Sequence, residues 1–167
     1  MGSTENVARI KMNPKSQQTI DVTLSQHLRF RCLRCATFCC RLGGPQLTEK
    51  DAERIRQGGY DVRDFLEPVL DREFKGLPLM RFSLKSKGDG SCVFLRLDST
   101  QGVYGCSIYD FRPALCRLYP FDFERIGPNV LMLRIIPCCK GLNYSNGEIV
   151  DEEFIMKHLF NAILELM

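Results

Sequence analysis

The sequence has few residues of the types that build most catalytic metal sites. It contains two histidines, His27 and His158, and no tryptophan among its 167 residues. Hydrolytic zinc enzymes use mixed ligands, an open coordination position and a nearby general base, which histidine often supplies. The scarcity of histidine therefore argues against a hydrolytic metal enzyme. The sequence identifies no catalytic residue, and the question of enzymatic activity stays open.

Long apolar runs are also missing. The best candidate, residues 130–136, is seven residues long and contains Arg134, whereas a membrane-spanning helix needs about 20 apolar residues. The N-terminal residues have neither the apolar core of a secretory signal nor the myristoylation pattern. We therefore expect a cytoplasmic protein with no membrane partner. In that compartment structural disulfides are uncommon.

Charge of one sign does not dominate either. The chain has 23 basic and 20 acidic residues, a formal net charge of +3. A balance this even does not favour nucleic acid or a membrane surface as the partner.

What the sequence has in excess is cysteine, with nine residues. They fall into four regions of the chain: Cys32, Cys35, Cys39 and Cys40; Cys92 and Cys106; Cys116; and Cys138 with Cys139. A C-x2-C pair lets two thiolates converge on one metal ion, as in zinc ribbons and iron–sulfur loops. This density of cysteine in a cytoplasmic protein indicates at least one metal site. Buried free thiols and transient redox disulfides are the alternatives.

The adjacent cysteines suggest how many sites there are. In an extended chain, adjacent side chains point to opposite sides, so Cys39 and Cys40 would serve two neighbouring metals rather than one. The same holds for Cys138 and Cys139. The hypothesis is two four-cysteine sites close together. All-thiolate ligation suits zinc and iron–sulfur clusters equally.

The rest of the pattern predicts an α+β fold, with short helices and short antiparallel strands around the multi-cysteine site. Residues 1–19 are polar and are interpreted as a loose N-terminal arm, and residues 20–167 as the metal-binding domain. Thr48 and Asp51 resemble a capping box at the start of a helix. The predicted elements are helices over 49–57, 62–70 and 151–167, a helical turn over 112–117, and strands over 79–84, 92–95, 103–108, 121–126 and 130–136.

The helix over 151–167 is the clearest element. Ile155, Leu159, Ile163 and Leu166 recur at helical spacing and form one apolar stripe. This stripe covers the core in the simplest interpretation. The alternative is that it binds a second protein, an unknown partner.

Several blocks of residues resemble a known family in the same order. The segment from Phe30, F-x-C-x2-C-x3-C-C, resembles the opening motif of the YkgJ-like cysteine-cluster family, whose members are described as zinc- or iron-chelating. The blocks after it are Thr48-x2-Asp51, Cys92-Val93-Phe94-Leu95, Cys106-Ser107-Ile108-Tyr109 and the segment Arg112-Pro113-x2-Cys116-Arg117-x-Tyr119-Pro120-Phe121. The resemblance covers residues 30–141.

The resemblance implies a set of ligands, and three departures from the family pattern bear on it. Ala36 stands where the family has glycine. Three residues, not two, separate Cys35 from Cys39, and Lys140 replaces the proline of a closing Cys-Pro-Gly. The glycine after Lys140 favours Cys139 over Cys138. The implied metal ligands are Cys32, Cys35, Cys39, Cys40, Cys92, Cys106, Cys116 and Cys139, with Cys138 as an additional candidate.

The function implied is a metal-binding protein, holding zinc or an iron–sulfur cluster at one or two sites, with a structural, carrier or partner role. One alternative is an iron–sulfur redox enzyme or electron carrier. Another is a nucleic-acid-binding zinc module, which would need a concentrated basic face. The family's cysteine domain also resembles part of the flagellin lysine methylases. This chain has no G-x-G-x-x-G loop, which argues against methyl transfer by the chain alone.

Overall fold

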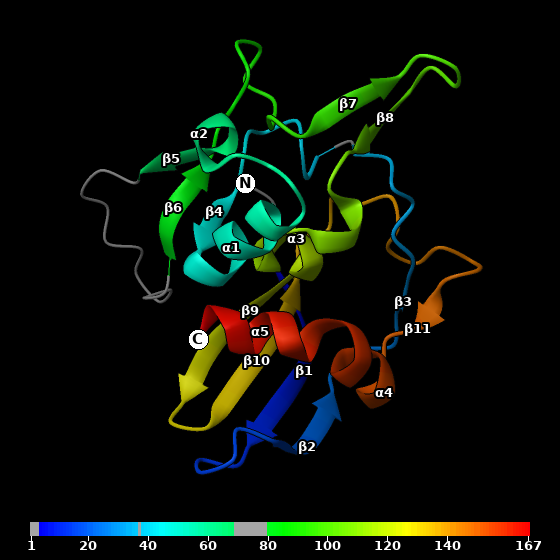
Figure 1. The fold of residues 1–167 in the computed structure, drawn as a ribbon. Helices are drawn as coiled ribbons and strands as arrows, with labels where there is room; N and C mark the ends of the chain where they lie inside the picture. Colours follow the sequence, from blue (N-terminus) through cyan, green and yellow to red (C-terminus); the bar gives the residue numbers. More distant parts are fainter. Residues whose placement is uncertain (1–3, 37, 69–79) are drawn as a thin grey trace. The chain divides into compact units, whose positions relative to one another are not determined.

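The computed structural model describes residues 4–36, 38–68 and 80–167, and the chain forms two compact units (Figure 1). Unit 1 comprises Met1–Leu33 and Leu118–Asn161, and unit 2 comprises Arg34–Arg117 and Ala162–Met167. Short helices and short antiparallel strands occur in both units, so the predicted α+β class is confirmed.

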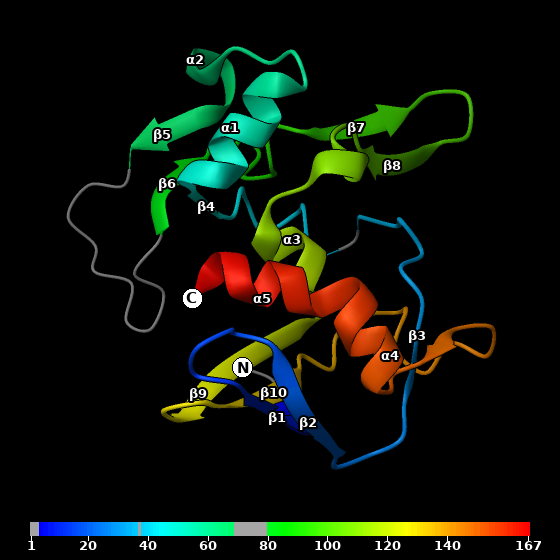
Figure 2. The ribbon, with the colours of Figure 1, turned by 60° about the horizontal axis from the view of Figure 1, so that its bottom comes forward.

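Unit 1 contains a four-stranded antiparallel sheet in the order β2-β1-β10-β9. Figure 2 shows these strands side by side. Their bounds are β1 (Glu5–Met12), β2 (Thr19–Leu24), β9 (Phe121–Gly127) and β10 (Val130–Ile135). The hairpin predicted over 121–136 is thus confirmed as β9 and β10.

The prediction of a loose arm over residues 1–19 is wrong for residues 5–12. These residues form β1, an internal strand that is bonded to β2 on one side and to β10 on the other. Val7, Ile10 and Met12 are buried, while Arg9 and Lys11 between them are exposed. The alternation of apolar and polar residues from 9 to 12 is the strand signal that the polar composition of the whole segment obscured.

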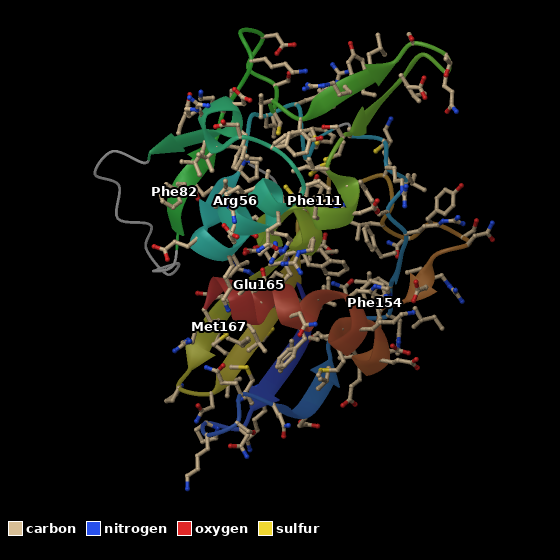
Figure 3. All side chains as sticks on the ribbon, viewed as in Figure 1. Arg56, Phe82, Phe111, Phe154, Glu165 and Met167 are labelled. Carbon is tan, nitrogen blue, oxygen red and sulfur yellow. The ribbon has the colours of Figure 1, made fainter. Side chains whose placement is uncertain are left out.

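The remainder of unit 1 is a small two-stranded pairing and the start of the last helix. β3 (Arg29–Phe30) pairs with β11 (Glu148–Ile149). The chain then forms α4 (Glu152–Phe154), a π-helical turn (Ile155–Leu159) and α5 (Phe160–Leu166). Phe154, labelled in Figure 3, packs with ring centroids 6.2 Å from Phe30 and 5.9 Å from Phe121.

The helix predicted over 151–167 is confirmed, with a π-helical turn that its periodicity did not predict. Ile155, Leu159, Ile163 and Leu166 are all buried. The apolar stripe therefore serves the protein's own interior, and a partner at this helix would have to contact its polar side. Among the described residues, no helix has the length and apolar character needed to cross a membrane.

Unit 2 combines a three-stranded sheet, a separate hairpin and several short helices. The sheet has the order β4-β6-β5, and β7 pairs with β8 in a sheet of their own. The strands are β4 (Gln46–Thr48), β5 (Leu66–Pro68), β6 (Met80–Leu84), β7 (Leu95–Asp98) and β8 (Val103–Cys106). The helices are α1 (Glu49–Gln57), α2 (Val62–Phe65), the 3-10 turn η1 (Tyr109–Phe111) and α3 (Ala114–Leu118).

The helix predicted over 49–57 is confirmed together with its capping box. The Thr48 hydroxyl accepts a hydrogen bond from the Asp51 amide at 3.1 Å, and the Asp51 carboxylate accepts one from the Thr48 amide at 3.0 Å. The helical turn near 112–117 is found as α3.

Two other predictions need correction. The helix predicted over 62–70 ends at Phe65 and gives way to β5; residues 69 and 70 lie outside the described residues. Pro68 disfavours helix at the residue before it, and β5 instead pairs with β6. The strand predicted over 92–95 begins only at Leu95. Cys92 contributes one isolated bridge, to Ser86. The predicted pairing with the segment that starts at residue 103 is confirmed, with Leu95 opposite Cys106.

The core of unit 2 contains cysteine as well as aliphatic and aromatic side chains. Its buried members are Ala36, Cys40, Leu47, Ala52, Ile55, Phe65, Leu84, Cys92, Phe94, Leu95 and Ile108, and Cys106 packs against them half-buried. Three of the candidate ligands thus belong to the hydrophobic core of this unit.

Candidate metal centre

The two units share the cysteines unequally. Unit 2 contains Cys35, Cys39, Cys40, Cys92, Cys106 and Cys116, and unit 1 contains Cys32, Cys138 and Cys139. None of the nine forms a disulfide. The six cysteines of unit 2 come from four separate segments: the loop 34–45, the turn after β6, the end of β8, and α3. We call the loop over residues 34–45 the cysteine loop.

The backbone of the cysteine loop turns sharply at the position where the sequence departs from the family pattern. Ala36 has a φ of 49° and Arg34 a φ of 53°, both in the left-handed region that favours glycine. The family's glycine at position 36 therefore matches the conformation of the backbone there. Further along, the Cys92 amide donates a hydrogen bond to the Cys40 carbonyl at 2.8 Å. This bond ties the loop to the turn that carries Cys92.

The sulfur atoms of Cys39 and Cys40 lie on the same side of the chain. Their Sγ atoms are 3.9 Å apart. Two thiolates on one tetrahedral zinc, at about 2.3 Å each, would be about 3.8 Å apart. The prediction that these adjacent cysteines point to opposite sides is wrong because residues 39–42 form turns rather than extended chain. The spacing now suits one shared metal.

Cys106 joins this pair through its thiol. The Cys40 thiol lies within sulfur hydrogen-bond distance of Cys39, and an interaction between Cys40 and Cys106 is the largest cause of the shifted pKa of both groups. The interaction with Cys40 is the main reason that the pKa of Cys39 and the pKa of Cys106 are lowered to about 7. The positive charge of Arg112 also lowers both pKa values. The interactions with Cys106 and Cys39, together with burial, raise the pKa of Cys40. Near neutral pH Cys39 and Cys106 are therefore partly ionised, while Cys40 keeps its proton until a metal displaces it.

Backbone amides also point at two of the sulfurs. The Ile108 N–H donates to the Cys106 sulfur, and the Phe94 N–H donates to the Cys92 sulfur, each two residues along the chain. Such hydrogen bonds favour the thiolate over the thiol. Burial is nevertheless the largest effect at Cys92 and raises its pKa.

Cys116 lies on α3 and is within electrostatic range of Cys92, Cys106 and Cys39. The residue keeps some exposed surface, yet its thiol lies deep enough that burial is the main cause of its raised pKa. Arg112 opposes this effect with its positive charge. The pKa of this thiol would fall once a cation lay beside it.

Asp51 fixes the start of the helix that carries Cys116. Its fully buried carboxylate accepts hydrogen bonds from the Ala114 amide at 2.9 Å and from Arg54 Nη1 at 2.8 Å, besides the capping bond to Thr48. Arg54 continues the network to Glu165 of α5, labelled in Figure 3, at 2.6 Å. The sequence pattern predicts the cap of α1 but not the bond to α3, because Ala114 lies 63 residues away.

The three cysteines of unit 1 follow β3 and β10. The Arg31 amide donates to the Gly141 carbonyl at 3.1 Å, which joins the chain just before Cys32 to the turn just after Cys139. The Cys138 sulfur is 3.2 Å from the Tyr119 hydroxyl. Cys138 and Cys32 are exposed, and Cys139 is half-buried.

Gly141 permits this close approach. A Cβ atom at this position would clash with the Arg31 carbonyl oxygen. We expect Gly141→Ala to lower the free energy of unfolding by about 1–3 kcal/mol, as overpacking against fixed atoms does. Gly88→Ala is the matched control, because a Cβ there would meet no atom within 4 Å. Urea denaturation of both variants measures the difference, and equal stability would contradict this role for Gly141.

The histidines do not add to the thiol group in unit 2. His158, in unit 1, is 3.1 Å from a Glu148 oxygen and stacks on Phe154, with ring centroids 4.7 Å apart. His27, also in unit 1, lines an open hollow with Leu28 and Arg29. Both are accounted for by packing or surface contacts, as expected for His27.

The described residues include no complete ready-made ligand group. Within 4–36, 38–68 and 80–167, no three Cys, His, Asp or Glu side chains stand in an arrangement that could hold a metal ion unchanged. The donor chemistry of unit 2 still fits a metal. The Cys39 and Cys40 sulfurs are 3.9 Å apart, Cys106 interacts with Cys40, and a backbone amide and Arg112 favour the thiolate form of Cys106.

Comparison with known proteins agrees with this chemistry. Residues 31–134 match the family CxxCxxCC, described as "Putative zinc- or iron-chelating domain". The chain is also similar to the uncharacterized protein MJ0661 of Methanocaldococcus jannaschii, with 32% identity over 163 residues that cover 93% of this chain and 83% of the relative. No solved structure matches the chain. The family match spans more than half of the sequence, and the chain therefore belongs to the CxxCxxCC family of zinc- or iron-chelating domains.

Proposed function

We propose that this protein binds zinc or iron through the cysteine thiolates of unit 2 and acts as a metal carrier. The observation that supports this most directly is the 3.9 Å separation of the Cys39 and Cys40 sulfur atoms, together with the interaction of Cys106 with Cys40. These three would be the first ligands, and Cys92 and Cys116 are the nearest candidates to complete the set. Cys35 belongs to the same unit, while Cys32 and Cys139 remain predicted ligands from unit 1.

The exposure of the ligands favours a carrier over a purely structural site. Cys40 and Cys92 are buried, whereas Cys39 and Cys35 are exposed. Structural zinc sites are closed by four protein ligands and gain nothing from an open side. A ligand set with one exposed side lets a metal enter or leave without unfolding the core of the unit.

The charge of the site also fits a thiolate-bound cation. Four thiolates around one Zn²⁺ leave a charge of about −2. Arg112, whose positive charge acts on Cys39, Cys106 and Cys116, offsets part of it. A sulfur-only donor set suits both zinc and iron–sulfur clusters, because both bind thiolates. The redox or electron-carrier role would apply only to the iron form.

Anaerobic purification followed by metal analysis tests the proposal. A colourless protein with zinc supports a zinc carrier. A brown protein with iron and acid-labile sulfide supports the iron–sulfur alternative. One metal per chain would contradict the hypothesis of two four-cysteine sites, and two would support it. Protein that stays metal-free after incubation with zinc and after anaerobic cluster reconstitution would overturn the proposal.

A single substitution tests the ligand assignment. We expect Cys40→Ser to lower metal affinity by at least about 10–100-fold, the loss that follows even from removing a residue that only supports a ligand. Cys138→Ser is the matched control, because Cys138 lies outside the unit 2 thiol group. Competition with a chromophoric chelator measures both affinities. A Cys40→Ser affinity no weaker than that of the unchanged protein would exclude the proposed ligand role of Cys40, and a loss in Cys138→Ser would add Cys138 to the ligands.

A further inference from the structure

Three arginines stack on two tyrosines beside the cysteine loop. The guanidinium carbons of Arg34 and Arg112 lie 4.0 Å and 3.7 Å from the centre of the Tyr109 ring. The guanidinium carbon of Arg41 lies 4.5 Å from the centre of the Tyr104 ring. Two of these arginines come from the cysteine loop, and both tyrosines are within three residues of Cys106. The stacks therefore flank the thiol group of unit 2.

Arg34 and Arg41 differ from the arginines that serve the fold. Among the described residues, five arginines pair with carboxylates: Arg54, Arg56, Arg63, Arg117 and Arg134. Within the part of the chain that the structure describes, the guanidinium groups of Arg34 and Arg41 make no ion pair and no hydrogen bond, and both residues are exposed. Stacking restrains a guanidinium while leaving its N–H edge able to bind a carboxylate.

Apolar side chains continue the surface around Arg41. Tyr104, which Arg41 covers, is directly opposite Leu97 in the β7–β8 pairing, and Leu97 is 53% exposed. Leu42, next to Arg41 in the chain, is 84% exposed, and Phe38 is 41% exposed. Figures 1 and 2 show β7 and β8 as a ribbon that projects from the rest of unit 2. Exposed apolar groups beside fixed charges are typical of protein-binding surfaces.

We propose that this surface binds a segment of a partner protein that is rich in both carboxylate and apolar side chains. Carboxylates would pair with Arg34 and Arg41, and apolar side chains would pack on Leu42, Phe38 and Leu97. The charge complementarity comes from two preorganised cations that lack an acidic partner among the described residues. Binding of such a segment goes beyond metal binding and does not depend on it.

The same surface is less suited to nucleic acid. Single-stranded nucleic acid binds by stacking its bases on open aromatic faces. Here arginines lie over the Tyr104 and Tyr109 rings. The most exposed apolar side chain of the surface is Leu42, which offers neither a charge for a phosphate nor a face on which a base can stack.

Selection from a random 12-residue peptide library displayed on phage tests the proposal with the full chain as bait. We expect the selected peptides to be enriched in Asp and Glu together with Leu, Ile or Phe. One selected peptide, synthesised with a fluorescent label, should lose at least about tenfold in affinity for the double variant Arg34→Gln/Arg41→Gln. Anisotropy titration measures the loss.

The control is the double variant Arg9→Gln/Arg125→Gln, which removes the same charge from exposed arginines of unit 1. Equal losses in the two double variants would show general charge attraction and overturn the proposal. Selected peptides without acidic residues would also overturn the proposal. If a 12-residue oligouridine bound more tightly than the peptide and lost affinity only in the Arg34/Arg41 variant, the surface would be a nucleic-acid site instead. The metal content of each variant, measured in parallel, separates this result from any failure of metal binding.

Discussion

Replacing Asp51 with alanine is expected to lower the free energy of unfolding by about 2–5 kcal/mol, because it leaves two buried backbone amides without their acceptor, at about 1–3 kcal/mol each. The carboxylate has no exposed surface and accepts hydrogen bonds from the Thr48 amide, the Ala114 amide and Arg54. Its loss would leave two backbone amides at helix starts and one guanidinium without that acceptor. A small protein is stable by only about 5–15 kcal/mol, so the variant would be close to unfolding.

Urea denaturation of Asp51→Ala and of Glu53→Ala makes the comparison. Glu53 also pairs with an arginine of α1, Arg56, but on an exposed face of the helix, where such pairs contribute little. Asp51→Asn should fall between the two, because one amide oxygen still accepts while the amide nitrogen faces another donor. A loss at Asp51 no larger than that at Glu53 would show that the buried network is not a main support of unit 2.

This network shows which parts of the fold could be predicted from the sequence. The spacing of Thr48 and Asp51 predicts a capping box because both partners lie within one turn of helix. The bond from Ala114 joins segments 63 residues apart, and no local pattern encodes that distance. Long-range pairing of this kind decides where Cys116 lies relative to the other thiols, so the sequence could name it as a candidate ligand but could not identify its neighbours.

The cysteine loop shows the same limit at shorter range. The density of cysteine predicts metal chemistry, and the family match agrees with it. The assumption of an extended chain nevertheless predicted the wrong geometry for Cys39 and Cys40. Arg34 and Ala36, near the start of the cysteine loop, have left-handed backbone conformations. Neither residue type predicts this conformation, which favours glycine. Glycine at position 36 would have been the signal.

The β1 strand illustrates a different cause of error. Its segment is polar in composition, but its period is that of a strand, with Ile10 and Met12 buried and Lys11 exposed between them. A strand in the middle of a sheet needs partners from elsewhere in the chain, and β1 finds one of them in β10, more than 100 residues away. Composition alone therefore did not predict that residues 5–12 form a strand.

Removal of the bound metal is expected to increase hydrogen exchange selectively in unit 2. If the proposed thiolate site is loaded at 1,000 times its Kd, binding stabilises the bound form by about 4.1 kcal/mol, which is about 1,000-fold in protection. The amides that report it are those tied to the ligands: Cys92, bonded to the Cys40 carbonyl, and Leu95, bonded to the Cys92 carbonyl. Ser107, which follows Cys106 and donates to the Phe94 carbonyl, is a third reporter.

The sheet of unit 1 supplies the internal reference for this measurement. The amides between β1 and β10 belong to a ladder that contains no cysteine, so chelation should leave their exchange nearly unchanged. Exchange followed by mass spectrometry on metal-loaded and chelator-treated protein resolves the two sets of peptides. A uniform increase in both units would mean that the metal stabilises the chain as one cooperative body. No increase at Cys92, Leu95 and Ser107 would place the metal away from the unit 2 thiols, because a metal that binds only the folded site stabilises the segments that carry its ligands against opening.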